Sequence, residues 1–76
     1  MSAMPAEVKT QAVTANLKAI EALLAVAAKQ SAEACLLSQC AQHNEAIGTV
    51  FGLDALLEDV TALYSAVVVL HRLKAR

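Results

Sequence analysis

The chain has few aromatic residues, few glycines and few prolines. It contains no tryptophan, aromatics make up 3% of its 76 residues, and it holds two glycines and one proline. A β-sandwich or barrel needs a turn about every 8–12 residues, and turns are built mainly from such residues. A fold of many strands is therefore excluded.

Charged residues are also scarce, at 17%, and they are balanced, with seven acids against six bases and a net charge of −1. Proteins dedicated to nucleic acids carry a basic excess, so we expect no nucleic-acid partner. Hydrophobic residues reach 58%, mainly 17 Ala, 11 Leu and 8 Val. That content is too apolar for a disordered tail. The composition predicts an all-α protein rich in alanine.

The length predicts one small domain over residues 1–76. A chain of this size buries only about 60% of its unfolded surface when it folds alone. Its apolar content is more than such a domain easily hides. Because small helical hairpins commonly pair into four-helix bundles, we expect a homodimer.

The apolar segments are too short to predict a membrane span. The beginning, MSAMPAEVKT, lacks the basic and apolar regions of a secretory signal, so we expect a cytoplasmic protein. The longest apolar stretch, Val60–Leu70, has 11 residues with charged residues on both sides, against about 20 for a spanning helix. Association of Val60–Leu73 with a membrane surface stays open as an alternative.

The first half of the chain has a helical repeat. Pro5 suits the first turn of a helix, and no glycine or proline follows before Gly48. Apolar residues recur at spacings of four and three, as on one face of a helix. This predicted stripe consists of Val13, Leu17, Ile20, Leu24 and Ala27.

The last part of the chain shows the clearest repeat. Its stripe alternates spacings of three and four without exception and consists of Leu53, Leu56, Val60, Leu63, Val67 and Leu70. Leu57, Tyr64, Val68 and His71 flank this stripe, so the apolar arc is wider than a coiled-coil seam. Acidic residues near its beginning and basic residues at its end complement the helix dipole.

Two architectures are compatible with these repeats. In the favoured one, helices over about 6–42 and 45–74 form an antiparallel hairpin with a turn centred on Asn44, and two hairpins form a four-helix bundle dimer. Asn suits this turn because it tolerates left-handed backbone. In the alternative, helices near 6–28, 32–47 and 53–74 form a three-helix bundle monomer, with a break near Ser31.

Few residues could carry chemistry. The candidate metal or ligand residues are Cys40 and His43, which would share a helix face, whereas Cys35 would point elsewhere. We expect the cysteines to be buried, free and structural, with no metal and no cofactor. No nucleophile stands at a catalytic spacing from a base, and no phosphate-binding loop occurs, so we expect no enzyme.

The functional prediction is a non-enzymatic helical protein that acts as an adaptor, regulator or chaperone through self-association and binding of an unknown protein. The ten residues of the two stripes from Val13 to Leu24 and from Leu53 to Leu70 would form the self-association interface. Phe51, Val69 and Leu73 would form the partner surface. Short Ala/Leu hairpins occur in many unrelated small bacterial proteins, so this likeness concerns the fold alone.

Overall fold

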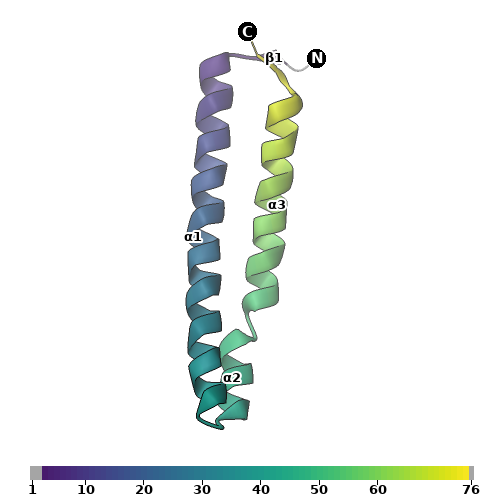
Figure 1. Cartoon of the computed structure of the whole chain (residues 1–76). Coiled ribbons are helices and arrows are strands. Elements are labelled where there is room, and N and C mark those ends of the chain that lie inside the picture. The colour runs from purple at the N-terminus through teal and green to yellow at the C-terminus, as the bar shows by residue number, and fades with distance from the viewer. Residues whose placement is uncertain (1–2, 76) are drawn as a thin grey trace.

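The computed structural model describes residues 3–75 as a long helical hairpin. One limb is α1 (Ala6–Gln39), and the other is α2 (His43–Val50) followed by α3 (Leu53–Arg72). α1 packs against both α2 and α3, which follow each other along its length (Figure 1). The all-α prediction is confirmed.

The hairpin is a rod rather than a sphere. Its extents are 57 × 17 × 11 Å and its radius of gyration is 17.4 Å, whereas a compact domain of this length has a radius of gyration of about 11 Å. α1 alone has 34 residues, which correspond to about 50 Å of helix. Each limb therefore has a single intramolecular neighbour.

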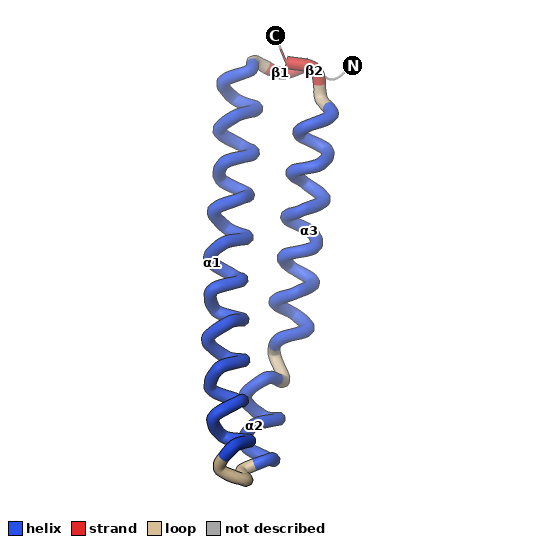
Figure 2. The backbone as a smooth tube through the Cα atoms, in the orientation of Figure 1, coloured by secondary structure: helices blue, strands red, loops and turns tan. Residues whose placement is uncertain are grey.

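Two very short strands join the ends of the chain. β1 (Ala3–Met4) pairs in parallel with β2 (Lys74–Ala75), and Ala3 lies opposite Lys74. Figure 2 shows this pairing across the open end of the hairpin, where α1 begins and α3 ends. The strands link the two limbs and add no separate layer.

α1 is continuous through the segment where a three-helix bundle requires a break. Pro5 precedes its first residue, and the Pro5 carbonyl accepts the Lys9 backbone N–H at 3.0 Å. The expected break near Ser31 is absent, because no glycine or proline interrupts the helix before Gln39. The alternative prediction of separate helices near 6–28 and 32–47 is therefore wrong.

A regular seam runs along α1 and faces the other limb. Its half-buried residues alternate spacings of four and three, which keeps them on one face of the helix. They are Lys9, Val13, Asn16, Ile20, Leu23, Ala27, Gln30, Ala34 and Leu37. Ala12 and Ala19, each one residue before a seam residue, are half-buried beside the seam.

The predicted stripe of α1 is partly wrong. Leu17 and Leu24, expected on the buried stripe, are about half exposed, and Asn16 and Leu23 occupy the seam instead. The reason lies further along the helix. The predicted stripe ends at Ala27, and the same spacing continued beyond it would reach Ser31 and Ser38, whereas the observed series brings Leu37 into the interface.

The stripe of α3 agrees with its prediction. All six of its residues from Leu53 to Leu70 are half-buried, and the flanking Leu57 and Tyr64 are exposed. The six half-buried residues face the seam of α1. Together the two series form the alternating layers of an antiparallel helix pair.

The turn of the hairpin lies at Ala41, not at Asn44. Ala41 has a φ of 63°. The N–H of Gln42 donates to the Leu37 carbonyl at 2.9 Å, and the N–H of Ala41 donates to the Ser38 carbonyl at 3.0 Å. This is the Schellman ending of a helix, with alanine at the position where glycine is most common. Asn44 belongs to the first turn of α2.

The second limb is interrupted at Phe51 and Gly52. The N–H of Phe51 donates to the Gly48 carbonyl at 3.4 Å, and Gly52 has a φ of −86° and a ψ of 0°. The expected single helix over 45–74 is therefore two helices. The alternative architecture predicts a last helix over 53–74, and its first residue is correct because α3 begins at Leu53.

The seam of α3 predicts that Val67→Asp unfolds the hairpin, since a carboxylate would be placed among the half-buried side chains without a partner. Far-UV circular dichroism should show loss of most helix. Val69→Asp is the matched control, because Val69 lies two residues further on the same helix and is about half exposed. Retention of wild-type helix content by Val67→Asp would contradict the seam.

The turn predicts that Ala41→Gly stabilises the protein. Left-handed backbone costs an L-residue about 1–2 kcal/mol, and glycine avoids this cost. Thermal unfolding should shift upward by about 4–8 °C for each kcal/mol gained. Ser38→Gly, within α1, should lower the midpoint instead. An unchanged or lower midpoint for Ala41→Gly would be inconsistent with the turn.

Candidate interaction surface

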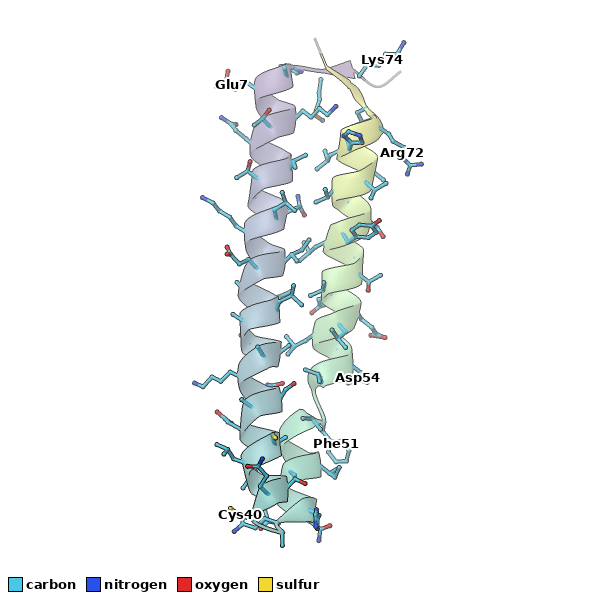
Figure 3. The ribbon with its side chains drawn as sticks, in the orientation of Figure 1. Glu7, Cys40, Phe51, Asp54, Arg72 and Lys74 are labelled. Atoms are coloured by element: carbon cyan, nitrogen blue, oxygen red, sulfur yellow. The ribbon has the colours of Figure 1, made fainter. Side chains whose placement is uncertain are left out.

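The candidate metal residues do not form a site. Cys40 follows the end of α1 and His43 begins α2, so the turn separates them and they share no helix face as expected. Figure 3 shows Cys40 at the closed tip of the hairpin. Within residues 3–75, no group of three or more His, Cys, Asp or Glu side chains is placed to hold a metal ion.

The cysteines are exposed, contrary to the expectation of burial. Cys35 and Cys40 are both free thiols on the surface. The long rod explains the difference, because only one face of α1 is covered by the other limb and Cys35 lies off that face. Neither thiol therefore contributes to a core.

No pocket is present in the described part of the chain. The acidic residues at the beginning of α3, Asp54, Glu58 and Asp59, are all exposed, as expected for a solvated helix face. None of the helices over residues 3–75 is long and apolar enough to cross a membrane. What the structure offers for interaction is an extended surface rather than a cavity.

Lys9 ties the two limbs together at the open end. Its Nζ donates to the carbonyl of His71 at 3.0 Å and to that of Leu73 at 2.9 Å. Both carbonyls lie at the end of α3, where the helix leaves carbonyls without partners within the helix and where a positive charge is favourable. The half-buried Lys9 thus caps α3 and sets its position along α1.

Two amide side chains interrupt the apolar seam of α1. Asn16 donates from Nδ2 to the Ala12 carbonyl at 2.8 Å. Gln30 is half-buried, and its Oε1 is buried without a hydrogen-bond partner. A buried polar atom left unpaired costs about 1–3 kcal/mol. The seam is therefore less stable than its spacing alone suggests.

Ten large apolar side chains of the described residues are exposed on the outer surface. Phe51, expected on a partner surface, is 76% exposed at the junction of α2 and α3 (Figure 3). Val69 is about half exposed, whereas Leu73 is partly covered. The exposed large hydrophobic residues are Val8, Leu17, Leu24, Val26, Leu36, Ile47, Phe51, Leu57, Tyr64 and Val69.

The residues predicted to mediate self-association fall into two groups. Eight of the ten are half-buried in the contact between the limbs of one chain: Val13, Ile20, Leu53, Leu56, Val60, Leu63, Val67 and Leu70. Leu17 and Leu24 remain available on the outside. Leu57 and Tyr64, which flank the stripe of α3, are also exposed, although the spacing pattern alone predicts no partner role for them.

Comparisons with protein-family models, curated proteins and solved structures found no match to this chain.

The unpaired amide predicts that Gln30→Leu stabilises the protein by about 1–3 kcal/mol, because leucine removes the buried oxygen and adds apolar area. Chemical denaturation should show a higher midpoint. Gln11→Leu is the control, since Gln11 is exposed on the same helix. Equal midpoints for the two variants would show that the Gln30 oxygen carries no cost.

Proposed function

We propose that this protein is a non-enzymatic helical protein that self-associates and acts by binding another protein, as an adaptor, regulator or chaperone. The observation that carries the proposal is its surface area. The chain exposes 5481 Å², whereas a compact monomer of its mass exposes about 4,400 Å². The difference of about 1,100 Å² exceeds the roughly 800 Å² that each partner contributes to a stable interface.

The lack of a closed core supports the same proposal. Among the described residues Ala46 alone is buried, at 6% exposure, and the seam residues are half-buried. A half-buried seam is one side of a core that another layer of helices would complete. Two hairpins packed together give the four-helix bundle in which such seams face inward.

The proposed assembly leaves apolar residues for a second protein. Phe51 lies at the α2–α3 junction, and Val69 is about half exposed on α3. Exposed apolar residues of this kind commonly mark a protein-binding surface. The free, exposed thiols Cys35 and Cys40 suit a reducing compartment, so the proposal places the protein in the cytoplasm.

The proposal predicts a dimer. Light scattering after size exclusion, with reductant present, should give twice the chain mass of 7.9 kDa. On dilution the mass should fall toward that of one chain, because association depends on concentration. A mass of one chain at every concentration would overturn self-association.

A further inference from the structure

The two limbs carry matching apolar stripes beside the seam. On α1, Leu17 and Leu24 each follow a seam residue by one position, and on α3 Leu57 and Tyr64 do the same. Each helix turns by about 100° per residue in the same hand. Because the limbs are antiparallel, a residue that follows the seam lies on the same side of the hairpin in both. Leu17, Leu24, Leu57 and Tyr64 therefore share one side, called here the leucine–tyrosine face.

The contact of Lys9 sets the register within this face. Lys9 reaches the carbonyls of residues 71 and 73. One residue forward on α1 then corresponds to one residue back on α3, since both are α-helices with the same rise. This register places Leu17 near Tyr64 and Leu24 near Leu57. The face consists of two successive apolar pairs.

The opposite side of the seam is different in character. The residues that precede the seam there are mixed. They include the exposed Val8, Val26, Leu36 and Val69 as well as the small Ala12, Ala19 and Ala66 and the charged Asp59. By the register above, no two of the large apolar residues lie across from each other. Charge does not separate the two sides, because Asp59 precedes a seam residue on this side and Glu21 and Asp54 follow seam residues on the other. What distinguishes the leucine–tyrosine face is that its large apolar residues form two pairs across the seam.

We propose that the leucine–tyrosine face is the surface on which a second copy of this chain docks, an inference that rests on the self-association proposed above. A helix that packs in a bundle of four needs apolar residues on the seam and on one flank, and both limbs have their flank on this side. A second copy presents the same pattern, so the pairing is self-complementary about a two-fold axis. The excess of about 1,100 Å², counted over the whole chain, is of the size that one protomer contributes to such a dimer.

Matched double variants test the assignment. Leu24→Lys with Leu57→Lys places two charges on the face, whereas Val26→Lys with Val69→Lys places two charges elsewhere. The four side chains are 45%, 48%, 45% and 49% exposed, in that order. Light scattering over a dilution series should show the dimer weakened by about 100-fold in the first variant. The control variant should keep the wild-type dissociation constant.

Tyr64 gives a second measurement that needs no substitution. It is the only tyrosine, and the chain has no tryptophan, so its fluorescence reports this face alone. Quenching by acrylamide should weaken as the protein passes from monomer to dimer. This measurement remains decisive if the lysine variant loses its helix content by circular dichroism.

The outcomes separate the two proposals. A dimer that survives Leu24→Lys with Leu57→Lys, or one in which Tyr64 is quenched as easily as in the monomer, overturns the docking face and leaves self-association standing. A monomer at every concentration overturns both. Tyr64 shielding that appears only with vesicles of phosphatidylcholine and phosphatidylglycerol would assign the face to lipid and overturn the second copy as its occupant.

Discussion

The contact between α1 and the second limb is the constraint on which the rest of the structure depends. A pair of helices has one seam, and each helix can bury only the stripe that faces its neighbour. With a single seam along a rod 57 Å long, nearly every residue keeps some contact with solvent. The exposed hydrophobic residues, the exposed cysteines and the proposed association all follow from this geometry.

The contacts at the open end of the hairpin restrict how one limb can shift along the other. A seam of aliphatic residues alone would tolerate shifts by whole turns, because each layer resembles the next. Lys9 donates to the carbonyls of His71 and Leu73 at the end of α3, and a shift of one limb by several turns would break this contact. β1 and β2 pair at the same end. Asn16 bonds within α1 and Gln30 Oε1 has no partner, so these two residues lower the stability of the seam and make no hydrogen bond to the other limb.

The sequence predicted the all-α class and the whole stripe of α3, because the repeat from Leu53 to Leu70 has no exception. The prediction of the buried stripe was partly wrong for α1, because both the seam and the residues beside it include leucines. Leu17 and Leu24 satisfy the spacing as well as Asn16 and Leu23 do, and hydrophobicity favours the wrong choice. The turn was missed for a related reason: Ala41 gives no local signal for left-handed backbone, whereas Asn44 does.

The sequence was enough to predict that the chain is helical and that it has more apolar surface than one small domain hides, whereas it left a single hairpin and a three-helix bundle both open. These properties follow from composition and local spacing. Which leucines face the other limb and which remain outside became clear from the packing, since that choice depends on how α1 fits α2 and α3 over its whole length. The candidate interaction surface is what this packing leaves uncovered, so it could be located only after the seam was known.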